Sequence, residues 1–291
     1  MPRAIRPRRS LLYMPGSNAR ALDKARTLPA DVLIMDLEDA VAPDAKDEAR
    51  RLACAAVKAG GYGQREVIIR VNGLATPWGL NDIVAAATSG ADGIVLPKVE
   101  GPGIVRQVES LLDVHDTPAG MSIWCMVETP LGVLHAERIA GAGPRLAGLV
   151  MGTSDLAKDL HASHTLDRVP VLTSLSLCLL AARAFGTAIV DGVHLDLADA
   201  EGFARACRQG AELGFDGKTL IHPSQIGPAN DAFAPSAESV AKARRIIAAH
   251  RNATAAGRGV LVVDGRLVEN LHVEQARRTL ALAEAIEAMA A

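Results

Sequence analysis

Two carboxylates, Glu128 and Asp155, each stand at or just beyond the end of an apolar run of the sequence. Glu128 ends a run that begins at Ile123, and Asp155 follows the run Gly148–Met151. If these runs are neighbouring parallel strands, both carboxylates can face one point at the edge of the sheet. Carboxylate oxygens suit hard divalent cations, and Mg²⁺ in particular keeps open positions for water and substrate. The pair therefore predicts a magnesium site.

Other metals and purely structural roles explain this pair less well. His194 and His222 are the histidines at strand ends and no Cys accompanies them, so the pattern does not favour zinc or iron. As structural residues, Asp155 would cap the helical stretch that begins at Leu156, and Glu128 would pair with an arginine. The placement of both carboxylates on neighbouring strand ends favours metal binding.

Arg70 lies near the end of another apolar run, Val67–Val71. A buried guanidinium is costly unless it has an anionic partner. A substrate carboxylate or a developing oxyanion would make Arg70 a catalytic and substrate-binding residue. The alternative is an internal ion pair with Asp36, Glu38 or Asp39, and the residues alone leave both interpretations open.

Lys98 follows Pro97 at the end of a further apolar run. A Schiff-base lysine is the hallmark of one class of barrel aldolase, but such a lysine needs an apolar pocket that lowers its pKa. The acidic residues expected around Lys98 would raise that pKa instead. We therefore interpret Lys98 as a charge that complements an acidic site.

These polar residues need elements that bring them together, and the sequence repeats one such unit. A short apolar run ends in polar residues or Gly/Pro, and an Ala-rich amphipathic stretch follows, which is typical of βα alternation. The candidate strands are Ser10–Met14, Val32–Asp36, Val67–Val71, Gly93–Pro97, Ile123–Glu128, Gly148–Met151, Ala188–Val193 and Thr219–His222. Their number and spacing predict a (β/α)8 TIM barrel. A doubly wound open sheet is disfavoured because no GxGxxG loop follows the first strand.

The barrel is expected to occupy residues 1–235, and residues 236–291 are expected to form a C-terminal helical extension. Helices are predicted over Ser236–Ala255 and from about Val273 to Ala290, with a small hairpin over Val260–Gly265. The last helix carries apolar residues at helical spacing, so it must pack on its own barrel or on a neighbouring subunit. We therefore expect an oligomer and not a monomer.

Composition limits the class of protein. With 291 residues, 49% of them hydrophobic, the chain can bury a full core, and a formal net charge of −2 indicates neither a nucleic-acid nor a membrane partner. No apolar run approaches the roughly 20 residues that span a bilayer. The four cysteines are widely spaced and form no CxxC pair, so we expect reduced core thiols in a cytoplasmic enzyme.

Several short motifs occur in a fixed order from about Arg9 to Gln225. They are RSLLYMPG (9–16), DLEDAV (36–41), IRVN (69–72), LPK (96–98), ETP (128–130), GTSDL (152–156), GK (217–218) and IHPSQI (221–226). Together they resemble the citrate lyase β-subunit-like family, part of the wider HpcH/HpaI aldolase and malyl-CoA lyase group. No single motif is decisive, but the ordered set is highly specific.

The resemblance implies a (β/α)8 barrel that is trimeric or hexameric. Members of the family use Mg²⁺ to cleave or condense CoA thioesters such as citryl-, malyl- or citramalyl-CoA. By position, the resemblance makes Glu128 and Asp155 the metal ligands and makes Arg70 the contact to the bound oxo-acid and the reacting oxygen. Glu38 and Asp39 would support the water shell of the metal and orient Arg70.

The resemblance also places Tyr13 and Lys218 on the CoA side of the site. The tail departs from the family pattern. Lyases of the family commonly carry a catalytic Asp in a motif Gly-x-Met-Ile/Val-Asp-x-Pro, supplied to the neighbouring subunit, whereas residues 265–271 have Glu269 at that position and no following Pro. Glu269 retains a carboxylate and is expected to act as an acid or base, displaced by about an ångström. Some relatives are thioesterases, and this tail leaves that activity open.

We therefore predict an Mg²⁺-dependent carbon–carbon lyase that converts a 3-hydroxyacyl-CoA thioester into an acyl-CoA and an oxo-acid. One alternative is a class II aldolase that cleaves free 4-hydroxy-2-oxo acids. Another is a citrate lyase β chain that works only within a larger complex. The sequence does not identify the acyl group, because specificity depends on loop shapes around the site.

Overall fold

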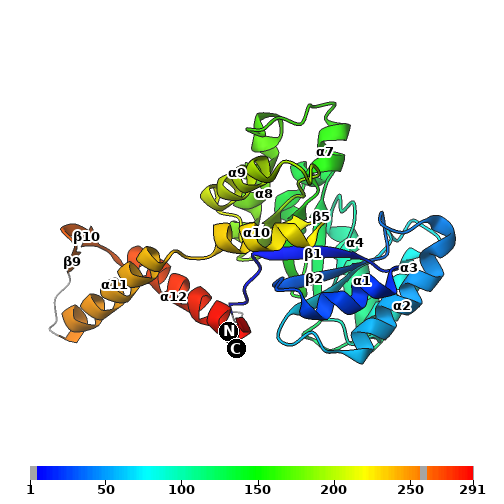
Figure 1. Cartoon of the computed structure of the whole chain (residues 1–291), viewed down its shortest axis with the longest axis horizontal. Helices are drawn as coiled ribbons and strands as arrows, with labels where there is room; N and C mark the ends of the chain where they lie inside the picture. Colours follow the sequence, from blue (N-terminus) through cyan, green and yellow to red (C-terminus); the bar gives the residue numbers. More distant parts are fainter. Residues whose placement is uncertain (1–4, 256–260, 291) are drawn as a thin grey trace. The chain divides into compact units, whose positions relative to one another are not determined.

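The structure is a computed structural model that describes residues 5–255 and 261–290. The chain divides into two compact units, coloured along the sequence in Figure 1. One unit is Arg8–Phe233, and the other contains the remaining described residues, most of them after Phe233. The boundary expected after residue 235 lies close to this division.

The larger unit is a closed barrel of eight parallel strands in chain order, with β8 pairing back onto β1. The strands are β1 (Ser10–Pro15), β2 (Val32–Asp36), β3 (Glu66–Arg70), β4 (Gly93–Leu96), β5 (Ser122–Val127), β6 (Leu146–Met151), β7 (Ala188–Asp191) and β8 (Gly217–Leu220). The predicted (β/α)8 architecture is confirmed.

Helices connect successive strands (Figure 1). They are α1 (Ala19–Lys24), α2 (Lys46–Ala59), α3 (Gly79–Ala87), α4 (Pro102–Val114), α5 (Pro130–Leu134), α6 (Ala136–Ala140), α7 (Thr153–Asp159), α8 (Val169–Ala184), α9 (Ala200–Leu213) and α10 (Ile226–Phe233). Short 3₁₀ turns lie at Ala25–Thr27, Pro43–Ala45 and Pro223–Gln225. In the described part of the chain, no helix is both long and apolar enough to cross a membrane.

Each strand contributes side chains alternately to two apolar layers. Residues such as Ile34, Ile68 and Trp124 fill the barrel interior, whereas Leu33 and Ile69 pack between the sheet and the helices. Because the side-chain period of a strand is two, this alternation also decides where polar strand residues point. The four cysteines are free and buried, as expected for core thiols.

The C-terminal unit contains α11 (Ala237–Ala255), β9 (Leu261–Val263), β10 (Arg266–Val268) and α12 (Asn270–Ala290). The two strands form an antiparallel hairpin across Asp264 and Gly265, both of which have positive φ, as a tight two-residue turn requires. The helices share a small core of Ala243, Ile246, Val273 and Ala276. The hairpin expected over Val260–Gly265 is present with its second strand beyond Gly265; Val260 itself lies outside the described residues.

A buried group of charges ties β7 and β8 to the helix layer. Asp191 is fully buried at the end of β7 and accepts hydrogen bonds from Nη1 of Arg168 at 2.6 and 2.8 Å and from Nζ of Lys218 at 3.0 Å. The Lys218 ammonium also donates to the Gly192 carbonyl. One carboxylate therefore balances two largely buried cations.

We predict that Asp191→Ala destabilises the barrel by about 3–5 kcal/mol, because it leaves both cations without their counter-charge. Equilibrium urea unfolding followed by circular dichroism measures this change. Asp23→Ala is the control, since it removes an ion pair with Arg26 whose carboxylate is largely exposed, and the midpoint should hardly move. Equal effects of the two substitutions would contradict the prediction.

Candidate active site at the mouth of the barrel

A bidentate ion pair joins the ends of β2 and β3. The register places Asp36 opposite Arg70, and Nε and Nη2 of Arg70 donate to the two Asp36 oxygens at 2.6 Å each. Both residues are buried. Burial alone would lower the pKa of Arg70, but the hydrogen bonds and charge of Asp36 raise it above its ordinary value. The internal ion pair considered for Arg70 is thus present, and it leaves Nη1 outside the pair.

Nη1 of Arg70 faces the other acidic residues of the loop after β2. It lies 2.9 Å from Oε2 of Glu38 and 3.4 Å from Oδ2 of Asp39. The Glu38 contact lacks hydrogen-bond alignment, and Oε2 has no hydrogen-bond partner among the described residues. Burial raises the pKa of Glu38, although Arg70 opposes this shift. Glu38 is therefore a buried carboxylate whose Oε2 is in ion-pair contact with Arg70 but accepts no aligned hydrogen bond.

Tyr13 covers the Arg70 guanidinium from β1, which is separated from β3 by β2. Its ring centroid lies 4.7 Å from the Arg70 Cζ, a cation–π distance, and its hydroxyl contacts the Met126 sulfur at 3.7 Å. Burial raises the pKa of Tyr13, so its hydroxyl stays protonated. The structure therefore brings together four of the predicted site residues: Tyr13, Glu38, Asp39 and Arg70.

Lys98 connects this group to the predicted metal ligands. It follows β4 with a left-handed backbone, φ 50°, and its amide donates to Oε1 of Glu128 at 2.7 Å. Its Nζ lies 3.3 Å from Oε1 of Glu38. Burial lowers the pKa of Lys98, but Glu38 and the other carboxylates raise it above its ordinary value overall. This direction supports our interpretation of Lys98 as a complementary charge and disfavours a Schiff-base lysine.

Glu128 packs against the start of α7, which carries Asp155 in its first turn. Gly152 precedes α7, and a Cβ at that position would collide with the side chain of Glu128. A glycine is therefore required where the two strand ends meet. Burial raises the pKa of Glu128 to about 7, with further increases from the charges of Glu38 and Asp155. Glu128 and Asp155 thus lie close enough to interact electrostatically.

This donor set fits Mg²⁺. Within residues 5–255 and 261–290, no group of three or more His, Cys, Asp or Glu side chains could hold a metal. Mg²⁺ is commonly held by one or two carboxylates and takes its other ligands from water and substrate. A cation beside Glu128 and Asp155 would also offset the unfavourable burial of the Glu128 charge. The residues that would hold it are the two predicted from the sequence.

Two other predicted site residues are not part of this group. Lys218 is buried in the ion pair with Asp191, and Leu220, two residues later on β8, packs in the layer outside the barrel. This placement gives Lys218 a structural role and does not support substrate contact. Glu269 is exposed, lies in the C-terminal unit and precedes α12, so its role as acid or base stays a prediction.

The sequence reasoning missed the contributions of Asp36, Gly152 and the Lys98 amide. Asp36 entered only as a possible partner of Arg70, although its position at a strand end, two residues after the inward-facing Ile34, would have indicated it. The Lys98 amide depends on a positive φ that sequence patterns do not reveal for a lysine.

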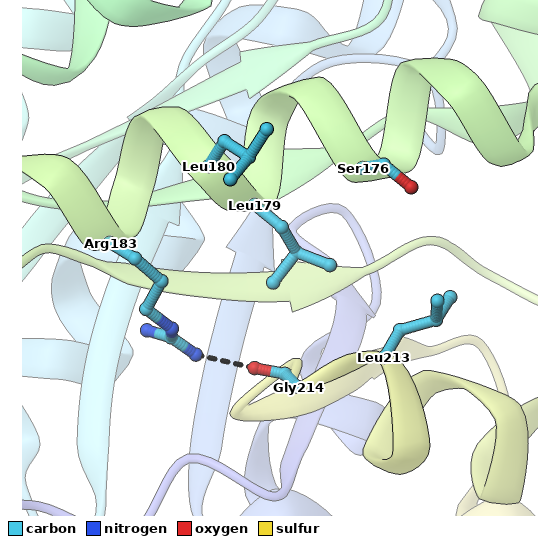
Figure 2. A pocket seen from close by; sticks show the side chains of 6 residues that line it. All are labelled: Ser176, Leu179, Leu180, Arg183, Leu213 and Gly214. Atoms are coloured by element: carbon cyan, nitrogen blue, oxygen red, sulfur yellow. Dashed lines mark hydrogen bonds between the residues drawn. The ribbon is translucent and has the colours of Figure 1, made fainter.

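A pocket on the outer helix layer has no features of an active site (Figure 2). It is lined by Ser176, Leu179, Leu180, Arg183, Leu213 and Gly214. The Ser176 hydroxyl donates to the backbone of its own helix, and Arg183 pairs with Asp216 and donates to the Gly214 carbonyl. Its polar groups are therefore already engaged.

The chain is similar to proteins of known name over its full length. The family model "HpcH/HpaI aldolase/citrate lyase" matches residues 9–223. A (3S)-malyl-CoA thioesterase from Cereibacter sphaeroides (strain KD131) is 51% identical, covering 100% of both chains. A citrate lyase subunit beta from Leuconostoc mesenteroides subsp. cremoris is 37% identical, covering 96% of this chain and 94% of the relative. The crystal structure of CitE from Mycobacterium tuberculosis with magnesium, acetoacetate and coenzyme A has a TM-score of 0.76 at 33% identity, covering 97% of this chain and 99% of CitE.

We predict that Glu128→Gln weakens Mg²⁺ binding by at least about tenfold, because it removes a charged ligand while keeping the shape and an acceptor for the Lys98 amide. Isothermal titration calorimetry of the purified chain with Mg²⁺ measures this effect. The control is Glu137→Gln on the exposed face of α6, which should bind Mg²⁺ as the wild type does. Unchanged affinity in Glu128→Gln would remove Glu128 from the metal site.

The raised pKa of Glu128 also predicts the pH dependence of metal binding. With a pKa of about 7, the carboxyl holds a proton at lower pH, and this proton competes with the cation. The Mg²⁺ dissociation constant should therefore rise by up to about tenfold per unit as pH falls below 7 and should level off above it. Titrations between pH 6 and pH 8 test this, and a flat profile would contradict it.

Proposed function

Because the chain belongs to the HpcH/HpaI aldolase/citrate lyase family, we propose that it acts on a CoA thioester of a 3-hydroxy dicarboxylic acid of the malyl-CoA type. The observation that carries this proposal is the 51% identity, over the whole of both chains, to a (3S)-malyl-CoA thioesterase. Glu128 and Asp155 would hold Mg²⁺, in line with the magnesium in the related CitE structure.

Mg²⁺, when bound, would act as a Lewis acid that polarises substrate oxygens and neutralises negative charge. Arg70 would bind an anionic substrate oxygen through Nη1, the part of its guanidinium that Asp36 does not use. The bidentate pair prevents rotation of the guanidinium, so this donor is already oriented before substrate binds.

Glu38 is the best-placed proton acceptor among these residues. Its Oε2 is buried and without a hydrogen-bond partner in the described part of the chain, and burial raises the pKa of the Glu38 carboxyl above its ordinary value, which favours its accepting a proton. Lys98 and Arg70, on either side, would stabilise the carboxylate that returns after the proton leaves. Tyr13 has a protonated hydroxyl. It would either contact the substrate as an uncharged side chain or donate a hydrogen bond to it.

Thioester hydrolysis is the first candidate for the net reaction. A water molecule would add to the thioester carbonyl carbon and pass a proton to a carboxylate; the carbon–sulfur bond would then break, and the carboxylate would return that proton to the CoA thiolate, giving the free hydroxy acid and CoA. The full-length similarity to a thioesterase favours this outcome.

Carbon–carbon cleavage, the reaction predicted from the sequence, is the second candidate. The substrate hydroxyl would lose its proton to Glu38 while the carbon–carbon bond breaks, which leaves an oxo-acid and an acyl-CoA enolate that must gain a proton. The contact between Glu38, the proton acceptor, and the Arg70 cation favours carbon–carbon cleavage. Glu269 is proposed as the acid for the enolate, supplied by a neighbouring subunit of a homotrimer or homohexamer.

We propose a cytoplasmic enzyme, in agreement with four buried free thiols. Experiments on the isolated chain can also distinguish two other functions. A class II aldolase would cleave a free 4-hydroxy-2-oxo acid without CoA. A non-autonomous citrate lyase β chain would be inactive in isolation and would regain activity with partner proteins.

We predict that the isolated chain with Mg²⁺ converts (3S)-malyl-CoA to CoA thiol and malate, with little glyoxylate or acetyl-CoA. Free thiol is followed with a disulfide dye, glyoxylate by its phenylhydrazone, and both acyl-CoA species by chromatography. Glyoxylate and acetyl-CoA in equal amounts without free thiol would establish the lyase instead. Turnover that persists in excess chelator, or in Glu128→Gln, would contradict the metal-dependent mechanism.

A further inference from the structure

Lys46 is buried, as Lys218 is, and it contacts the main chain of the loop that carries Glu38. Lys46 is the first residue of α2 and is only 6% exposed. Its Nζ donates to the main-chain carbonyls of Leu37 at 2.9 Å and Glu38 at 2.6 Å, and it lies 5.5 Å from the ring centroid of Trp78. No carboxylate in the described part of the chain forms an ion pair with this ammonium. Its partners are backbone oxygens and an aromatic face.

Local structure does not explain a lysine at this position. The positive end of the helix dipole disfavours a cation in the first turn, where Asp47 and Glu48 are the suitable residues. Burying an ammonium without a counter-charge is also unfavourable, and an apolar side chain of similar volume is often more stable. The hydrogen bonds of Lys46 go to two main-chain carbonyls, and its one other contact named above is the ring of Trp78.

Those carbonyls belong to the loop that carries Glu38. Within the loop, the Glu38 amide donates to Asp36 and the Glu38 carbonyl accepts from the Val41 amide. From outside the loop, the Leu37 carbonyl also accepts from the side-chain amide of Asn72 at 2.9 Å. Among the described residues, Lys46 is the group outside segment 36–41 that hydrogen-bonds to the Glu38 main chain. The Leu37 amide also donates to the Arg70 carbonyl at 2.9 Å, which ties the start of the loop to β3, and Lys46 adds the direct contact to the Glu38 carbonyl.

We propose that Lys46 is a positioning residue, which fixes the Leu37–Glu38 backbone so that the Glu38 carboxylate meets Arg70 and Lys98. Oε2 of Glu38 lies 2.9 Å from Nη1 of Arg70, and Oε1 lies 3.3 Å from Nζ of Lys98. This inference rests on the proposed function in that Glu38 transfers the proton. A displacement of about 1 Å can reduce turnover by about 100-fold, so small movements of this loop matter.

The test is Lys46→Met, which keeps the long apolar stem and removes the donors. We expect kcat for thioester turnover to fall by roughly 10- to 100-fold, with KM and the Mg²⁺ dissociation constant within about twofold of wild type. The matched control is Arg65→Met. Arg65 also donates to main-chain carbonyls, those of Ala25 at 2.9 Å and Leu28 at 2.7 Å, but it precedes β3 at the opposite end of the barrel, so kcat should not change.

A double-mutant cycle separates positioning from general destabilisation. If Lys46 acts through the Glu38 carboxylate, Lys46→Met should reduce kcat in the wild type and have little further effect in Glu38→Gln. If the substitution lowers kcat by the same factor in both backgrounds, Lys46 does not act through Glu38 and the proposal is wrong. Thermal unfolding of each variant shows whether lost activity reflects lost folded protein.

Hydrogen–deuterium exchange gives a readout that does not need activity. Lys46→Met should speed exchange at the hydrogen-bonded amides of Glu38, Ala40 and Val41, whereas Arg65→Met should leave them protected. Unchanged protection would overturn the inference even if the enzyme turns over its substrate. Faster exchange in a chain that acts on no CoA thioester would instead refute the proposed function alone. If Lys46→Met does not fold, Lys46→Leu, which is shorter and also removes the donors, replaces it in both measurements.

Discussion

The site depends on the buried ion pair between Asp36 and Arg70. Strand register places the two residues opposite each other, and their inward direction follows from the alternation that puts Ile34 and Ile68 inside the barrel. A guanidinium at this depth is tolerated because Asp36 binds it through two parallel hydrogen bonds. With Nε and Nη2 engaged in this way, the orientation of Nη1 towards the mouth is fixed, and Tyr13 covers the guanidinium face.

From this pair a chain of alternating charges runs across the mouth. Glu38 meets Arg70 on one side and Lys98 on the other, and the Lys98 amide holds Glu128. Burial raises the pKa of both Glu38 and Glu128; the charge of Arg70 opposes the rise at Glu38, and the hydrogen bond from the Lys98 amide opposes it at Glu128. With a pKa of about 7, Glu128 is divided between charged and neutral forms near neutral pH, which suits reversible binding of a divalent cation.

The strands could be predicted from the sequence where both of their faces are buried, because such strands are uniformly apolar. β2 has the predicted bounds, whereas β7 ends at Asp191, two residues earlier than expected, where Gly192 packs closely against Thr153. Lys218 could not be placed from the sequence, because the direction of a side chain near the start of a strand depends on strand bounds that are uncertain by a residue or two. Arg70 could be singled out because a charge at the end of an apolar run is visible without that knowledge, whereas the role of Glu38 came from the family resemblance, and both roles stay predictions.

One bound thioester can lead to either net reaction, because the same groups bind its oxygens in both. Arg70 Nη1 and the metal would neutralise negative charge whether it develops on the hydroxyl oxygen or on the thioester carbonyl. What differs is the second proton: cleavage needs an acid for the enolate carbon, while hydrolysis needs a positioned water and its base. In the proposed mechanism the tail would supply this carboxylate, and the residue at that position is Glu269, one methylene longer than Asp. On this proposal the choice between hydrolysis and cleavage would depend on the C-terminal unit, while the barrel mouth would determine which substrates bind.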